Sequence, residues 1–214
     1  YTTAAAPSSS YDGVYARTSN SDNVLGDINP DWTGGIKNSF KYKDFNASFL
    51  IDIQEGGNFF SLDTYYGFAT GIYDRSVGNN ELGNPIRNSI ADGGGVILPG
   101  VNADGSPNTT RGRTDWYANP FGYSRGMNAQ HVYDASFVKL REVSIGYDFP
   151  ESYIENSPFT AASISLIGRN LWIISKNSPY TDPEAGLSAG NIQGNQSGAY
   201  PSVKELGVNV KLQF

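Results

Sequence analysis

The sequence has no cysteine and only one histidine and one methionine among its 214 residues. Without cysteine, disulfides, thiolate metal sites and cysteine nucleophiles are excluded. With a single histidine the H-E-x-x-H pattern is also missing, so we expect no enzymatic activity. The single histidine, His131, precedes a predicted strand, and we interpret it as a residue at the rim of the sheet.

Long apolar runs and basic clusters are lacking as well. No stretch approaches the roughly 18 consecutive apolar residues of a transmembrane helix. Lysine and arginine are scattered and the net charge is −6, so we expect no nucleic-acid partner. Only 38% of the residues are hydrophobic, which argues against a large dry core. Residues 1–10 do not resemble a secretory signal, so we expect that a signal was cleaved or that the chain is a fragment.

Aromatic and turn-forming residues are abundant instead, with 14 Tyr, 11 Phe, 25 Gly and 11 Pro. This composition favours β-structure with many turns. The clearest pattern is an alternation of period two over residues 205–214, which predicts a strand with one apolar and one polar face. The apolar positions of this strand are Leu206, Val208, Val210, Leu212 and Phe214.

Four further strands are predicted, at 35–42, 45–53, 135–147 and 161–173. Lys43 and Asp44 read as the tight turn of a hairpin between the first two. In the second strand, Phe45, Phe49 and Ile51 share the apolar face. In the third, the apolar positions change parity, so we expect a β-bulge near Arg141 and Glu142.

The connections alternate between short and long. They comprise two residues at the hairpin, about 80 over 55–130, about 12 over 148–160 and about 30 over 175–204. Outer-membrane β-barrels place short turns on the periplasmic side and long loops outside. We therefore predict an all-β, antiparallel transmembrane barrel segment with extracellular long loops and a periplasmic C-terminus. A soluble β-sandwich is the alternative, but an 80-residue connection without regular structure and an exposed terminal Phe disfavour it.

Several stretches resemble the SusC/RagA-type TonB-dependent outer-membrane transporters of Bacteroidota. They are NPDWTGGIKN at 29–38, FNASFLID at 45–52 with QEGG at 54–57, DASFVKLREVSIGY at 134–147, GRNLW at 168–172, DPE at 182–184 and YP at 200–201. The resemblance covers nearly the whole chain beyond residue 29.

The resemblance implies the last five or six strands of a 22-stranded barrel whose plug and TonB box are absent from this sequence. Residues 1–34 would be an extracellular loop with the end of a preceding strand, and residues 35–214 the C-terminal strands and loops. The implied partners are a SusD-like surface lipoprotein, the TonB complex through the missing N-terminal part, the lipid of the outer membrane, and the barrel-assembly machinery, which would recognise Phe214.

Two functions remain open at this point. The whole protein would import large nutrients such as oligosaccharides or peptides, or the barrel would serve as a non-transporting scaffold subunit of an outer-membrane complex. Five strands cannot close a barrel, and an open sheet edge cannot face lipid. The chain therefore requires further strands from elsewhere.

The long loops hold the candidate binding residues. We expect substrate contacts in the outer vestibule from rings combined with charges, at Arg111, Arg113, Asp115, Trp116, Tyr117 and Tyr123. The polar strand face should line the lumen or meet the plug, through Lys37, Ser39, Lys41, Asn46, Ser48, Asp52, Asn209 and Lys211. Asp182 and Glu184 are interpreted as residues that order a loop.

Calcium is the one cofactor for which the sequence offers a candidate loop. The oxygen-rich residues Asn102, Asp104, Ser106 and Asn108 alternate around Gly105 but lack the order of a calcium loop and its distal glutamate. A plain Asp-Gly turn is the favoured interpretation, and calcium in an outer loop is the alternative.

Overall fold

The protein is described here by a computed structural model, which covers residues 13–17, 23–115, 119–123, 126–186 and 193–214. The chain divides into two units. The sheet unit comprises Asp27–Asn58, Asp134–Ala185 and Tyr200–Phe214. The loop unit comprises Tyr1–Gly26, Phe59–Tyr133 and Gly186–Ala199.

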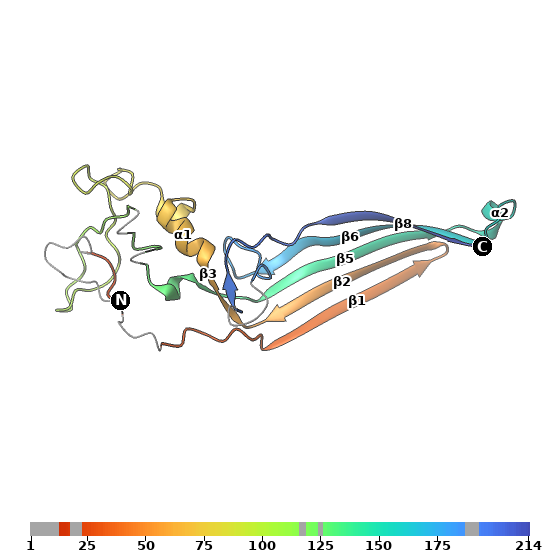
Figure 1. The fold of residues 1–214 in the computed structure, drawn as a ribbon, viewed down its shortest axis with the longest axis horizontal. Coiled ribbons are helices and arrows are strands. Elements are labelled where there is room, and N and C mark those ends of the chain that lie inside the picture. Colours follow the sequence, from red (N-terminus) through yellow and green to blue (C-terminus); the bar gives the residue numbers. More distant parts are fainter. Residues whose placement is uncertain (1–12, 18–22, 116–118, 124–125, 187–192) are drawn as a thin grey trace. The chain divides into compact units, whose positions relative to one another are not determined.

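The sheet unit is built on five long antiparallel strands in the order β1-β2-β5-β6-β8 (Figure 1). They are β1 (Trp32–Tyr42), β2 (Phe45–Glu55), β5 (Phe137–Asp148), β6 (Ala161–Lys176) and β8 (Glu205–Gln213). All five predicted strands are present, with ends that differ by up to three residues. The antiparallel fold is confirmed, and the sheet is open, with β1 and β8 at its edges.

The predicted turn and the predicted bulge are both confirmed. Tyr42 pairs with Phe45, which leaves a two-residue turn, and Lys43 takes a positive φ of 53°. A positive φ at this position suits the twist of a two-residue hairpin. The pairing of β2 with β5 steps from Glu142 to Leu140 and skips Arg141, as a β-bulge requires. The bulge therefore keeps Val138 and Leu140 on the same face as Val143, Ile145 and Tyr147.

Cross-strand register assigns every strand residue to one of two faces. One row runs through Tyr42, Phe45, Tyr147, Ile164 and Val210, from one edge of the sheet to the other. Side chains that are paired in this way point to the same face. We call this side the apolar face, and the opposite side the polar face.

The loop unit contains regular structure that the sequence did not reveal. It holds β3 (Asn58–Ser61), α1 (Leu62–Thr70), η1 (Asp74–Ser76), η2 (Asn128–His131), β4 (Val132–Asp134) and β7 (Asn195–Gln196), and the three strands form a second sheet in the order β4-β3-β7. The expectation of a long connection without regular structure was therefore wrong. The shorter 148–160 connection also carries one helical turn, α2 (Glu151–Ile154).

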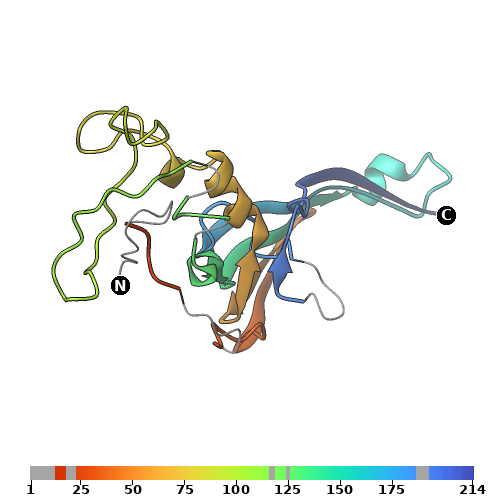
Figure 2. The same ribbon diagram turned by 60° about the vertical axis from the view of Figure 1, so that its left-hand side comes forward.

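Helix α1 follows β3 directly (Figure 2) and has defined caps at both ends. The Ser61 hydroxyl accepts a hydrogen bond from the Thr64 amide, and Gly71 ends the helix with a φ of 81°. In the described part of the chain, no helix has the length and apolar character needed to cross a membrane.

Most of the buried apolar side chains belong to the loop unit. They include Phe59, Phe68, Ile86 and Leu98, whereas the sheet unit buries chiefly Phe137. The large sheet thus has little core of its own, and its apolar residues must be covered by something else.

His131 lies in the core of the loop unit, so its interpretation as a rim residue was wrong. Its side chain is fully buried, and Nδ1 lies 3.0 Å from the Thr64 hydroxyl. The rings of Phe60, Tyr65 and Phe68 surround it at centroid distances of 5.3–6.2 Å. Burial, with the nearby charge of Arg75, lowers the pKa of His131 to about 4. The histidine is therefore a neutral packing residue at pH 7.

Candidate functional site

The structure brings all the predicted lipid-facing residues together on the apolar face. Register aligns Phe45, Phe49 and Ile51 of β2 with the apolar positions of β5 and β6, and through them with β8. The β8 residues of this face are Leu206, Val208, Val210 and Leu212. Leu206 is 84% exposed and Phe45 57% exposed. An exposed apolar surface that spans five strands marks a contact with lipid or with another protein.

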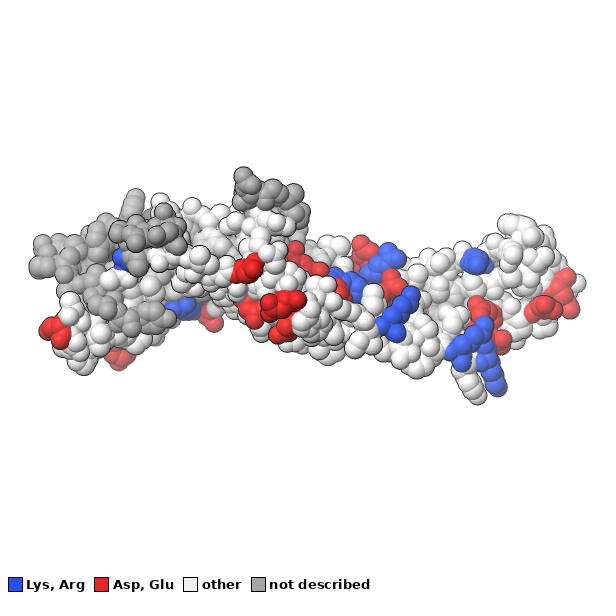
Figure 3. All heavy atoms as spheres, turned by 90° about the horizontal axis from the view of Figure 1, so that it is seen from below, with Lys and Arg blue, Asp and Glu red and all other residues white. Residues whose placement is uncertain are grey.

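The opposite face is polar on the same five strands. One row runs through Lys41, Asn46, Gly146, Ser165 and Asn209. The other predicted polar residues, Lys37, Ser39, Ser48, Asp52 and Lys211, fall on this face by the same register. Acidic and basic side chains are interspersed over the sheet (Figure 3). The sheet is therefore wet on one side and apolar on the other.

A network of charged residues sits on the polar face at the bulge. Arg141, the bulged residue, donates to Asp52 from Nε at 3.0 Å, to Glu184 at 2.7 Å and to the Asn170 side chain at 2.9 Å. The bulge adds a second consecutive side chain to this face beside Glu142, which pairs with Arg169 at 3.0 Å. The bulge thus serves to aim Arg141 into the network.

Lys139 completes the network and is almost completely buried, with 2% of its surface exposed. Its ammonium donates to Asp182 at 2.6 Å and also to Glu184. It lies 5.0 Å from the centre of the Phe137 ring, in a cation–π contact. A buried ammonium requires such partners, because an unpaired charge in the interior is costly.

Asp182 ties the 175–204 connection together and to the sheet. Its carboxylate accepts hydrogen bonds from the amides of Glu184 at 3.1 Å and Ser202 at 2.9 Å. Burial alone would raise the pKa of Asp182, but the bonds from Lys139 and Ser202 outweigh burial and hold this pKa at about 2. The pKa of Glu184 is lowered in the same way, by Arg141 and Lys139 against the effect of burial. The interpretation of both acids as loop-ordering residues is confirmed.

The sequence motifs contain every member of this network, but the pattern did not pair them. Lys139 and Asp182 are 43 residues apart. The available signal was that Lys139 and Arg141 alternate with the apolar residues Val138 and Leu140, while two acids follow in the next long loop.

The charged vestibule candidates are paired within the loop unit. Arg111 forms an ion pair with Glu81, and Arg113 forms one with Asp115. The Arg111 side chain is only 17% exposed and also donates to the Gly95 carbonyl at 3.3 Å. These arginines therefore have structural partners in the loops.

Tyr123, the described aromatic candidate, packs against α1. Its ring stacks on Tyr66 with centroids 5.3 Å apart, and its amide donates to the Tyr65 carbonyl at 2.8 Å. Tyr66 is 42% exposed. Trp116 and Tyr117, the other two candidates, lie outside the described residues.

The oxygen-rich loop forms a turn held by its own side chains. Asp104 accepts hydrogen bonds from the amide and hydroxyl of Ser106 at 2.9 and 2.6 Å, and the Asn102 amide bonds the Ser106 carbonyl. Gly105 has a φ of 84°, which suits the turn. Within the described ranges, no group of three or more His, Cys, Asp or Glu side chains is arranged to hold a metal ion.

The terminal Phe214 is 82% exposed, and its ring meets Phe159 edge-on with centroids 5.1 Å apart. The Thr160 amide donates to the Gln213 carbonyl at 2.7 Å. The end of β8 is thereby fixed beside the start of β6.

An open antiparallel sheet with one apolar and one polar face has the fold of a segment of a β-barrel wall, and comparison with solved structures confirms this fold class. The RagAB peptide importer in the open-open state matches 94% of this chain with a TM-score of 0.57 and 19% identity, over 19% of the matched chain. In the closed-closed state, the match covers 95% of this chain and 20% of the matched chain, with a TM-score of 0.59 and 18% identity. At these identities, the likeness shows the fold alone.

Sequence comparison points to the same class of protein. TonB-dependent receptor P3 of Formosa agariphila is 28% identical over 197 residues, which are 89% of this chain and 17% of that protein. TonB-dependent receptor P26 of the same organism is 26% identical over 198 residues, again 89% of this chain and 18% of the relative. The chain thus spans less than a fifth of these relatives. No family model matches it.

The predicted resemblance to TonB-dependent transporters is confirmed by the sequence matches to TonB-dependent receptors, and the predicted fold by the RagAB structures. The small share of each relative that is covered is consistent with the predicted C-terminal part of such a protein. The matched proteins are named as receptors and importers, which fits the expectation that the chain is not an enzyme.

Proposed function

We propose that this chain forms part of the barrel wall of a TonB-dependent outer-membrane transporter that imports large nutrients, oligosaccharides or peptides. The observation that carries the proposal is the apolar face, which is continuous across all five long strands and exposed along most of β8. In a bilayer, lipid covers such a surface, and backbone groups are satisfied by strand pairing.

The polar face would line the lumen, and the long connections would form the outer vestibule. The two long connections join the ends of strands opposite to the Lys43 turn, so they belong on one side of the membrane. We place that side outside the cell and the C-terminus in the periplasm, where Phe214 would be recognised by the barrel-assembly machinery. The candidate contacts with substrate in these connections are the rings of Tyr66 and Tyr123 and the charges of Arg111, Arg113 and Asp115.

A SusD-like surface lipoprotein is the proposed partner over these loops, and TonB would act through parts of the protein outside this sequence. The solved RagAB importer supports the lipoprotein, because it pairs a SusC-like protein with a SusD-like one. The charged network would give the 175–204 connection a fixed base on the sheet beneath such a partner.

The membrane assignment is tested with Val210→Arg and Asn209→Arg in the complete protein. Both residues lie in β8, but Val210 is on the apolar face and Asn209 on the polar face. An arginine facing lipid near the midplane costs about 2–4 kcal/mol, whereas one facing the lumen remains hydrated. We expect heat-resistant, folded protein in the outer membrane to fall for Val210→Arg only. Equal losses for the two variants would contradict the proposed facing.

Transport is tested by uptake in living cells. Cells lacking the complete protein should lose uptake of a labelled oligosaccharide or peptide, and cells with uncoupled TonB should lose it equally. Normal uptake together with the loss of an envelope complex would instead support the scaffold function and overturn the transport proposal.

A further inference from the structure

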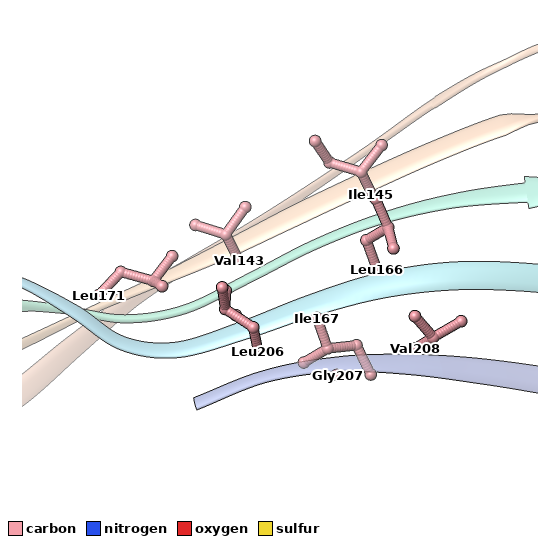
Figure 4. Close-up of a pocket in the computed structure, with 9 residues that line it drawn as sticks. Val143, Ile145, Leu166, Ile167, Leu171, Leu206, Gly207 and Val208 are labelled. Carbon is pink, nitrogen blue, oxygen red and sulfur yellow. The ribbon is translucent and has the colours of Figure 1, made fainter. Parts of the chain in front are cut away.

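A hollow of about 430 Å³ opens on the apolar face between β5, β6 and β8 (Figure 4). Its side chains come from three strands and include Val143, Ile145, Leu166, Leu171, Leu206 and Val208. The volume lies within the roughly 300–1,000 Å³ that sites for small ligands occupy.

Gly168 and Leu171 together shape the hollow. It pairs with Val143 on one side and with Leu206 on the other, so the middle of this three-strand row has no side chain. Leu171 leans over the gap, since a Cβ added at Gly168 would lie 2.8 Å from a Leu171 methyl group. The backbone of β6 is irregular here, with Asn170 at a φ of 49°. Glycine and bulge together open a lined depression instead of a flat surface.

A basic residue lies close in sequence to the part of β8 that lines the hollow. Lys204 is exposed and directly precedes β8, two residues before Leu206. The Asn170 side chain donates to the carbonyl of its neighbour Val203 at 3.2 Å, which holds this segment against β6. Among the ion pairs of the described residues, none involves Lys204.

Trp172 indicates the level in the bilayer at which this end of the hollow lies. It pairs with Leu140 on the apolar face and is 61% exposed. Tryptophan on a lipid-facing surface favours the level of the headgroups. The hollow therefore runs from the headgroup level, where Lys204 and Trp172 stand, toward the acyl-chain region.

We propose that the hollow binds an acyl chain of a phosphorylated glycolipid of the lipid A class, with Lys204 pairing with the lipid phosphate. An apolar depression with one unpaired cation at its mouth complements an anionic amphiphile and not a neutral one. The choice of a lipid from the outer leaflet rests on the proposed function, because the proposed orientation puts Lys204 on the outer side.

The test uses the complete protein purified from outer membranes and native mass spectrometry with added lipid A or phosphatidylethanolamine. Val208→Trp fills the hollow, and Val210→Trp is its control on the same face of the same strand but outside the lining. Lys204→Gln removes the cation, and Lys211→Gln is its control on the polar face of β8.

Lipid A should remain bound to the unmodified protein and to both controls. We expect Lys204→Gln to lower its retention about fivefold, the usual contribution of one basic residue near an anionic lipid. Val208→Trp should abolish retention, and phosphatidylethanolamine should bind weakly throughout. Retention that is equal in all variants, or equal for the two lipids, would overturn the site. Flotation of the same proteins with membranes tests the proposed function separately, since protein that floats normally but shows no such preference contradicts the lipid site alone.

Discussion

Lys139→Met is the sharpest test of the charged network. The methionine keeps the length and most of the volume of the side chain but leaves Asp182 and Glu184 without their shared ammonium. Removing one partner of a buried ion pair typically costs about 3–5 kcal/mol, because the remaining charge stays buried. Lys139 and Asp182 qualify as buried, with side-chain exposures of 3% and 4%.

The amides of Glu184 and Ser202 report on this loss, because both donate to Asp182. Their hydrogen exchange in the complete protein should accelerate by roughly two to four orders of magnitude, or to the unprotected limit. Lys41→Met is the matched control, since the Lys41–Asp148 pair is 67% and 44% exposed and such surface pairs contribute about 0–1 kcal/mol. If exchange at Glu184 and Ser202 were the same in the two variants, the network would not hold the connection.

Two further predictions concern the loop unit. Because the pKa of buried His131 is about 4 and that of an unfolded histidine about 6.5, stability is complete above pH 6.5 and falls by up to roughly 3 kcal/mol as the pH drops toward 4. Denaturant unfolding between these pH values should show this loss of stability, and His131→Phe should remove the pH dependence. A free energy of unfolding that does not change with pH in the unmodified protein would refute the prediction. Gly122→Ala places a methyl group 2.4 Å from the Tyr65 carbonyl oxygen and should cost about 1–3 kcal/mol, measured by exchange in α1. Gly207→Ala should leave the stability unchanged, because a Cβ added there has nothing within 4 Å. Equal losses of stability in the two variants would count against close packing around Gly122.

The strands could be predicted from the sequence because their physics is local. In the 205–214 segment, a period of two is sufficient to define a strand and its two faces. The parity change within 135–147 was sufficient to locate the bulge at Arg141, since only an extra residue could keep Val138 and Val143 on one face.

The loop unit could not be predicted in this way. Helix α1 has nine residues and weak amphipathic character, so its hydrophobic pattern cannot be distinguished within a region rich in tyrosine and glycine. It depends on tertiary contacts such as the Gln196 side chain, which binds Asp63 and Ser61 from 133 and 135 residues further along the chain. His131 was misplaced for the same reason: adjacency to a strand indicates position along the chain, whereas its burial is produced by Phe60, Tyr65 and Phe68.

The partners of the charged candidates could not be predicted for a different reason. Arg111 and Arg113 were chosen because the long loop combines charges with rings. Each has an acidic partner in the structure, and the partner of Arg111, Glu81, is 30 residues away. The sequence thus shows which loop residues are charged but not which of them form ion pairs. Composition alone could not separate the loop-bracing pairs from charges available to a ligand.

The central claim is that one face of the sheet meets lipid. Because the sequence contains no cysteine, spin labels can be placed singly at each position from Leu206 to Leu212 in the complete protein, reconstituted in a bilayer, once any cysteine elsewhere is replaced. Accessibility to dissolved oxygen, which concentrates in lipid, should peak at Leu206, Val208, Val210 and Leu212, and a water-soluble relaxant should reach the residues between them. Equal access of the water-soluble relaxant to both sets, or the reverse alternation, would contradict the account.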